Sequence, residues 1–306
     1  MRYAISLPQH LPDGSFRPNE FRDYLTRAEQ LGFESAWITE QVLGRIPHPS
    51  PLEIMAYAAA VTEEIRLGCS VFVTPLHSPV HLAKSISTLD QLSRGRLEIG
   101  VGIGGRNRMF SAFGVDPDDG LVTRFVEGID VMKALWTEPE ASVAGRFWQL
   151  DAAPMEPKPF QKPYPPLWFG GSHPAALRRA VRHGDGFFGA GSSTTASFIE
   201  QVRTVRSMLL ETGRDAARFG IAKRVYVAVD DDRRQARQRM SDALIAFYGE
   251  FGQTLLPVAV TGTAADCIAG LQQVADAGAQ VILVNPLFDI ADQMERLAAD
   301  VIPKVA

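Results

Sequence analysis

Glycines and small polar residues gather where short apolar runs of this chain end, and these positions could do chemistry. The run PLWF is followed by Gly170, Gly171 and Ser172, just before a helical pattern that begins at Pro174. Bare backbone N–H groups at a helix start bind anions because their partial positive charge adds to the helix dipole. The stretch indicates an anion site, with an ordinary strand-to-helix turn as the alternative.

Two further apolar runs end in the same way. Gly104 and Gly105 close the stretch GVGIGG, and Gly191 lies in GFFGAGSS. Glycine at a strand end lets a flat or charged ligand lie against the backbone. If the three ends share one rim, they predict a site for a large ligand that carries a phosphate.

Polar side chains at the other run ends are few. Glu40 is a candidate general acid or base, or else a hydrogen-bond partner that braces its strand. Gln41 can hydrogen-bond a substrate but cannot titrate. His10 lies in a loop and either faces a cavity or belongs only to that loop. His77 and His81 have i, i+4 spacing, but no third ligand is evident nearby, so we predict no metal site.

These residues are separated by regularly alternating elements. Mostly continuous apolar runs predict parallel strands that are covered on both faces. The predicted strands are Tyr3–Leu7, Ser35–Thr39, Leu67–Val73, Leu97–Val101, Leu167–Phe169, Gly186–Phe188, Ile221–Val229 and Gln280–Val284. The predicted helices are Asn19–Leu31, 50–64, Pro79–Arg94, 121–137, 174–183, 195–212, 231–248, 263–277 and 289–302.

Eight strands, each followed by a helix, predict an α/β fold of the (β/α)8 TIM-barrel type with insertions. We expect a single domain over residues 1–306, with an insertion at about 138–166 that holds one extra strand in GRFWQL and then a proline-dense stretch. Residues 249–262 make a second, shorter departure from the repeat. A doubly wound open sheet is the alternative fold. In a barrel, the strand ends described above would converge on one rim.

Composition limits the classes of function. The 306 residues are 46% hydrophobic and 22% charged, with a net charge of −4. Charges of both signs are interspersed, so we expect neither nucleic acid nor membrane as a partner. The start has no long apolar stretch typical of a signal peptide, and Cys69 and Cys267 are few enough to suit a reducing compartment. A cytoplasmic protein is predicted.

At this point the chain resembles a known family. The stretches SPVHLAKSISTLDQLSRGRLEIGVGIGG, EGIDVMKALW, PKPFQKPYPPLWFGGSHPAALRRAVRHGDGF and VTGTAAD look like those of the luciferase-like flavin or deazaflavin oxidoreductases. They most resemble the branch that uses the deazaflavin coenzyme F420. The likeness covers nearly the whole chain in the correct order. It implies a barrel with a flat coenzyme ring over the strand ends.

The resemblance also implies roles for individual residues. A bulge, often with a non-prolyl cis peptide, is expected at Ser70-Val71, against one face of the ring. Gly170, Gly171 and Ser172 would hold the coenzyme phosphate, and Gly104 and Gly105 would let the ring or its side chain pass close to the backbone. Three arginines of the next helix would lie too far along it to reach the phosphate and would face solvent; they are Arg178, Arg179 and Arg182. A small-molecule substrate and a homodimer are expected as well.

The departures from the family pattern keep several functions open. Many deazaflavin members carry histidine where this chain has Gln41, and sugar-phosphate dehydrogenase members carry glutamate where it has Gly105. The leading hypothesis is an F420-dependent oxidoreductase that transfers hydride between the reduced coenzyme and an organic substrate other than a sugar phosphate. The alternatives are an FMN-dependent monooxygenase, a cofactor-binding protein with a degenerate catalytic site, and an unrelated phosphate-sugar lyase or isomerase barrel.

The choice of F420 over FMN rests on the coenzyme tail. FMN ends at its phosphate, whereas F420 continues into an anionic chain that needs an open, polar exit. The neighbouring strand end reads GAGSSTT, which is small and rich in hydroxyls. Four basic residues near it in sequence are candidates to meet that chain: Lys158, Lys162, Arg178 and Arg182.

Overall fold

Eight parallel strands close into a barrel in the computed structural model, which describes residues 1–11, 13–105 and 108–305. The strands are β1 (Arg2–Ser6), β2 (Ser35–Ile38), β3 (Arg66–Val73), β4 (Leu97–Gly102), β7 (Leu167–Gly170), β8 (Gly186–Gly189), β9 (Gly220–Val229) and β11 (Val281–Asn285). Because β9 pairs with both β11 and β8, the sheet has no open edge at this seam. The predicted TIM barrel is confirmed, and the open-sheet alternative is wrong.

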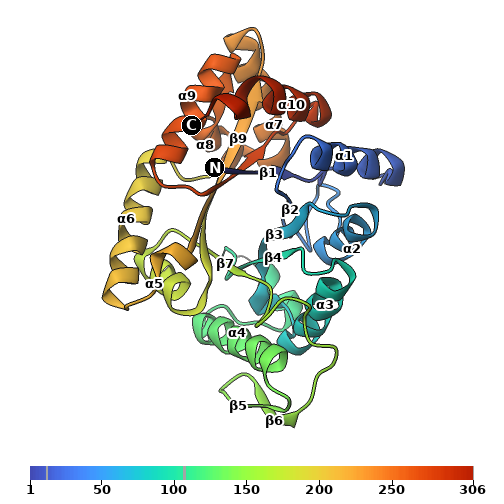
Figure 1. Cartoon of the computed structure of the whole chain (residues 1–306), viewed down its shortest axis with the longest axis vertical. Helices are drawn as coiled ribbons and strands as arrows, with labels where there is room; N and C mark the ends of the chain where they lie inside the picture. Colours follow the sequence, from blue (N-terminus) through green and yellow to red (C-terminus); the bar gives the residue numbers. More distant parts are fainter. Residues whose placement is uncertain (12, 106–107, 306) are drawn as a thin grey trace.

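Helices surround the ring of strands (Figure 1). They are α1 (Pro18–Gln30), α2 (Pro51–Val61), α3 (Pro79–Leu92), α4 (Leu121–Thr137), α5 (Pro174–His183), α6 (Thr195–Glu211), α7 (Arg233–Tyr248), α9 (Ala264–Asp276) and α10 (Ile290–Arg296). Several begin with a proline, whose fixed φ suits the first turn. α9 begins with a capping box in which Thr263 and Asp266 satisfy each other's backbone N–H groups.

Two layers of apolar side chains position the rim. The larger layer lies between strands and helices, and its side chains come from alternate strand residues. The smaller layer fills the barrel interior and consists of Ala4, Trp37, Trp168, Phe188, Ala222, Val281 and Leu283. The Trp37 and Trp168 rings meet edge to face, with centroids 6.4 Å apart. This packing fills the interior below the rim, so ligands must bind at the carboxyl ends of the strands.

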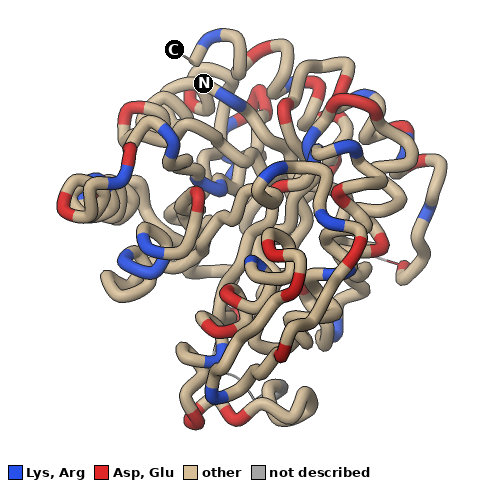
Figure 2. Tube along the Cα trace, turned by 60° about the horizontal axis from the view of Figure 1, so that its bottom comes forward, with Lys and Arg blue, Asp and Glu red and all other residues tan. Residues whose placement is uncertain are grey.

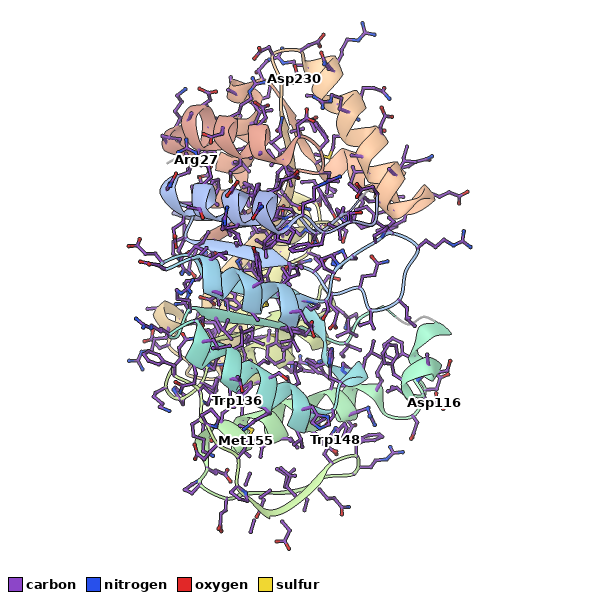
Figure 3. The ribbon with its side chains drawn as sticks, turned by 90° about the vertical axis from the view of Figure 1, so that its right-hand side faces the viewer. Arg27, Asp116, Trp136, Trp148, Met155 and Asp230 are labelled. Atoms are coloured by element: carbon purple, nitrogen blue, oxygen red, sulfur yellow. The ribbon has the colours of Figure 1, made fainter. Side chains whose placement is uncertain are left out.

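The insertion between α4 and β7 contains a hairpin rather than one strand. β5 (Ala141–Ala144) pairs antiparallel with β6 (Gln149–Ala153), and the hairpin projects at the bottom of Figure 1. The prediction of a single strand in GRFWQL was incomplete because the partner segment ASVA carries little apolar signal of its own. In the side view of Figure 3, Trp148 and Met155 lie between this hairpin and the barrel. Met155 belongs to the main core.

The proline-dense stretch after the hairpin packs along α3. Ser87 and Gln91 donate to the carbonyls of Pro157 and Lys158, and the Asp90 carboxylate accepts from Gln161. These hydrogen bonds between α3 side chains and the backbone of the insertion fix the insertion to the side of the barrel.

The second departure adds a helix and a strand that the sequence analysis did not predict. α8 (Glu250–Leu255) follows α7, and β10 (Val260–Gly262) pairs with residues 227–229 at the far end of β9. β9 is long enough to pair with β11 through residue 226 and then with β10. The remaining short helices are η1 (Thr74–Leu76), η2 (Arg108–Phe113), η3 (Ala216–Arg218), η4 (Leu256–Val258), η5 (Leu297–Val301) and η6 (Ile302–Lys304).

Charged residues of both signs are mixed over the whole trace (Figure 2), which agrees with the absence of a basic block in the sequence. Within the described ranges, no helix is both long and apolar enough to span a membrane.

Candidate functional site

One cavity of about 560 Å³ collects most of the predicted coenzyme-binding residues at the carboxyl ends of the strands. Seven of the eight line it: Ser70, Val71, Gly104, Gly170, Gly171, Ser172 and Gly191. The eighth, Gly105, lines a smaller neighbouring pocket of about 120 Å³, which shares Gly104 with the cavity. The three glycine-ended strands and the segment at Ser70-Val71 thus meet around one space. The cavity has the size of a cofactor site.

The Ser70-Val71 peptide bond is cis, and the pairing of β3 with β4 shifts register between Cys69 and Phe72. The expected bulge is therefore present. Gly102 on the neighbouring strand β4 makes room for it, because a Cβ there would lie 2.7 Å from a methyl group of Val71. The Ser70 hydroxyl is buried and has no hydrogen-bond partner among the described residues. It is an unused polar group on the wall of a ligand-sized cavity.

The end of β7 forms a cradle at the start of α5. Gly171 has φ of +140°, and a Cβ there would lie 2.7 Å from the Cβ of Ala176. The backbone can therefore approach α5 closely only with glycine at this position. Among the described residues, neither the Ser172 N–H nor the His173 N–H donates to a protein acceptor. These free donors at a helix start are suited to a phosphate group.

Arg179 differs from the expectation for its helix. It lines the same cavity as the cradle, whereas Arg178 and Arg182 are exposed. The prediction that all three arginines face solvent was therefore wrong for Arg179. Arg179 lies about one and a half turns into α5, and its long side chain stays within reach because it lies on the helix face toward the cavity. Burial lowers the pKa of its guanidinium, which stays charged at neutral pH.

Lys158 and Lys162 lie away from this rim. The Lys158 ammonium donates to the carbonyls of Leu135 and Glu138 at the carboxyl end of α4, and Lys162 donates to the carbonyl of Pro159. In a barrel, helix ends of this kind lie at the amino ends of the strands. The prediction that these lysines could meet the tail of a coenzyme was wrong. It relied on their closeness to the cradle in sequence, but the structure places them on the opposite face of the barrel.

Glu40 is held on both sides. One carboxylate oxygen accepts from the Val73 N–H at 2.7 Å, and the other lies 2.8 Å from Nε2 of His77. The side chain is 3% exposed. Val73 follows the bulge directly, so Glu40 ties the end of β2 to the bulged strand. This geometry leaves little room for the carboxylate to reach a substrate.

Glu40 and Gln41 line the smaller pocket together with Gly104 and Gly105. The two residues expected to act in catalysis are thus next to the 560 Å³ cavity rather than inside it. His77 is bonded to Glu40, and no group of three metal-binding side chains occurs in the described part of the chain.

The sequence analysis missed two polar residues of the cavity wall. Arg224 and Tyr226 alternate along β9 and line the cavity opposite the bulge. The Tyr226 hydroxyl donates to that of Tyr248 at 3.1 Å. Polar residues at alternate positions of the mostly apolar strand GIAKRVYVAV were the signal that could have identified them.

His10 lines a third and larger hollow, of about 880 Å³, between α1 and α10. Its ring stacks on Phe247 with centroids 3.9 Å apart. Burial and the nearby His48 and Arg224 lower the pKa of His10 to about 3, so the ring is neutral at physiological pH. His10 therefore does face a cavity, although not the one that holds the glycine cradle.

The chain matches a known protein family and individual relatives. The model of the family described as luciferase-like monooxygenase matches residues 1–284. An uncharacterized protein of Sinorhizobium fredii is 35% identical over 162 residues, which are 53% of this chain and 46% of that protein. The F420-dependent glucose-6-phosphate dehydrogenase of Intrasporangium calvum is 32% identical over 182 residues, or 56% of this chain and 54% of that one. These matches span about half the length of each relative.

Two solved structures share the whole fold. Monooxygenase RslO1 from Streptomyces bottropensis superposes with a TM-score of 0.86 at 23% identity, over 100% of both chains. An F420-dependent secondary alcohol dehydrogenase, in complex with an F420-acetone adduct, has a TM-score of 0.85 at 19% identity over 100% of this chain and 99% of that one. At these identities the likeness concerns the fold. Together with the family match over most of the sequence, it leads to one conclusion: this chain belongs to the luciferase-like monooxygenase family of oxidoreductases.

Proposed function

We propose that this protein is an F420-dependent oxidoreductase that transfers hydride between the reduced coenzyme and a small organic substrate. The observation that carries the proposal is the 560 Å³ cavity, in which the bulge at Ser70-Val71 faces the cradle at Gly170–Ser172. When bound, the deazaflavin ring would supply the hydride chemistry, and the chain would supply binding and orientation.

The residues present fit such a coenzyme. The free N–H groups of Ser172 and His173 and the cation of Arg179 would hold the phosphate. The unpartnered hydroxyl of Ser70 would bond to a polar edge of the ring. Val71 would pack against the ring face, where Gly102 of β4 and Gly170 of β7 leave it space.

Two features support F420 over FMN. Relatives of this chain include proteins named F420-dependent glucose-6-phosphate dehydrogenase. In addition, the residues beside the cradle are exposed and small or polar; they are Ser172, His173 and Ser192. This edge leaves a path on which an anionic tail would leave the cavity, beside the exposed Arg178 and Arg182.

The second candidate is an FMN-dependent monooxygenase. It is favoured by the superposition with a monooxygenase over the full length of both chains. The same bulge and cradle would serve FMN, because the two coenzymes share the shape of the ring and the phosphate. The absence of a titratable group at Gln41 affects both candidates equally.

The test is a spectroscopic titration of the protein with F420 and, separately, with FMN. We expect low-micromolar or tighter binding of F420, weakened by salt, and about tenfold or more weaker binding of FMN. Equal affinity, or purification with stoichiometric FMN, would replace the proposal with the monooxygenase.

A variant locates the site in the same titration. Ser172→Asp places a like charge beside the phosphate without a Cβ clash and should weaken coenzyme binding about tenfold or more. Gly171→Asp should do the same but also presses on Ala176. The control is Ala196→Asp, which adds the same charge in the first turn of α6, away from the residues that line the cavity. Unchanged affinity in Ser172→Asp would move the phosphate site elsewhere.

A further inference from the structure

Arg224 is a second cation on the wall of the coenzyme cavity. It lies on β9, where it pairs in register with Leu283 of β11, and its side chain passes beside Gly191. A Cβ on Gly191 would lie 3.4 Å from the Cδ of Arg224. The side chain of Arg224 therefore extends along the cavity at the carboxyl ends of the strands and does not lie on the outer surface of the barrel.

The partners of Arg224 are neutral. With the Asn285 amide oriented to suit its neighbours, its oxygen accepts from Nη2 of Arg224 at 2.7 Å and from Nε at 3.1 Å, while its nitrogen donates to the Ser6 hydroxyl. The Tyr226 ring lies 5.2 Å from the guanidinium carbon. Among the ion pairs of the described residues, none includes Arg224.

The nearby histidines are neutral or cationic by their chemistry, so they cannot supply a counter-charge, and their lowered pKa values mean only that they add no positive charge. Burial and the charge of Arg224 lower the pKa values of His10 and His48. A cation held in a protein interior without an anion is costly, since neutral hydrogen bonds orient it but do not neutralise it. Asn285 engages two of the five guanidinium N–H groups, and Tyr248 is a second, neutral hydrogen-bond partner of Arg224. The arrangement is that of a cation prepared for an anionic ligand.

The proposed phosphate site has a cation of its own, Arg179. The cradle follows β7, Arg224 is on β9, and β8 lies between them. Neighbouring strands are about 4.8 Å apart, so the two positions differ by roughly 10 Å. Arg224 therefore remains for an anion that lies toward the barrel axis.

We propose that Arg224 binds a carboxylate group of the organic substrate and so selects carboxylate-bearing molecules. This inference rests on the proposed function, because it places the substrate beside the coenzyme in the same cavity. The planar fork of arginine suits the two oxygens of a carboxylate, and such pairs are stronger than neutral hydrogen bonds. Neutral molecules of the same shape would leave the charge uncompensated and would bind more weakly.

The test compares butyrate with its neutral isostere butyramide by calorimetric titration of the full chain, with and without saturating coenzyme. The wild-type protein should bind butyrate about tenfold or more tightly than butyramide, and Arg224→Met should lose this preference. Arg224→Lys, which keeps the charge but not the fork, should retain part of it. Arg237→Met, which removes an exposed arginine of α7 that does not line the cavity, is the matched control and should behave as the wild type.

The outcomes separate this proposal from the assignment of the coenzyme. Equal binding of butyrate and butyramide by the wild type, or an unchanged preference in Arg224→Met, refutes the role of Arg224. A tenfold loss of coenzyme affinity in Arg224→Met also refutes it, since the cation would then serve the coenzyme. A protein that prefers butyrate but binds neither coenzyme refutes the proposed function and leaves the carboxylate site standing. If Arg224→Met does not fold, the wild-type comparison and Arg224→Lys decide.

Discussion

At the scale of single residues, hydrogen-bond partners decide what a side chain can do. Glu40 has the residue type of a general acid or base, yet its two oxygens are engaged by the Val73 N–H and the His77 ring. The residue type of Arg224 does not by itself indicate ligand binding. Its hydrogen-bond partners are neutral, however, so its positive charge is available to an anionic ligand. The geometry therefore supports a positioning role for Glu40, and it supports ligand binding for Arg224.

Substitutions at Glu40 distinguish positioning from proton transfer. A general acid or base replaced by Gln should lose about two to four orders of magnitude in turnover, together with one limb of the pH-rate profile. For a positioning residue we expect a loss of roughly tenfold in Glu40→Gln with both limbs retained. Glu40→Ala should lower stability by about 1–3 kcal/mol, because the Val73 N–H loses its acceptor.

The measurement is the pH dependence of turnover, with thermal unfolding in parallel. If Glu40→Gln loses one limb of the pH-rate profile while its coenzyme affinity is unchanged, Glu40 is the group that transfers the proton. His77→Ala is a useful companion, since it removes the same contact from the other side.

At the scale of elements, the shape of the cavity depends on how β3, β4 and β7 fit around the bulge. Val71 projects toward Gly102 on β4 and Gly170 on β7, where added Cβ atoms would lie 2.7 Å and 3.2 Å from its methyl groups. The register shift in β3 and the glycines of its neighbours are therefore one steric unit. The positions of these glycines can be read from the sequence, but only the pairing of the strands shows that they accommodate the side chain of Val71.

A double-mutant cycle tests this unit. Gly102→Ala should destabilise the protein by about 1–3 kcal/mol, because the new methyl group collides with Val71. Val71→Ala should relieve most of that cost when the two changes are combined, which gives a coupling energy of about 1 kcal/mol or more. Denaturant unfolding of the four proteins measures it. Additive effects would show that Gly102 is not required by Val71.

At the scale of the whole molecule, the outer faces of α2 and α3 carry several partly covered or exposed apolar side chains. Leu52, Ala56 and Tyr57 of α2 are only partly covered, and Leu92 of α3 is 63% exposed. Figure 1 places these helices together on one side of the barrel, with α6 on the other side. An apolar side of this kind fits the predicted homodimer.

Light scattering at micromolar concentration should give twice the 33.5 kDa mass of one chain. Ala56→Arg should shift the mass toward the monomer, because the charge would be buried between the copies. The control is Leu210→Arg on α6, where the native side chain is 80% exposed. A monomer mass for the wild type would refute the homodimer, and dissociation by Leu210→Arg would place the interface elsewhere.

The sequence by itself determined the repeat of strands and helices, and with it the barrel, because continuous apolar runs and helix-end signals are local properties. It also determined that glycine-ended strands would share a rim, since parallel strands in a barrel place all their carboxyl ends together. The extra strand β10 was missed because its three residues pair only with the far end of a long neighbour.

Only the tertiary structure decided which charged residues belong to the site. Lys158 is near the cradle in sequence but caps α4 at the other end of the barrel, whereas Arg224 is distant in sequence and lines the cavity. Arg179 faces the cavity while Arg178, one residue before it, is exposed. The direction of a side chain depends on the register of its strand or helix against its neighbours. The partners that compensate a charge come from other strands, so no local pattern specifies them.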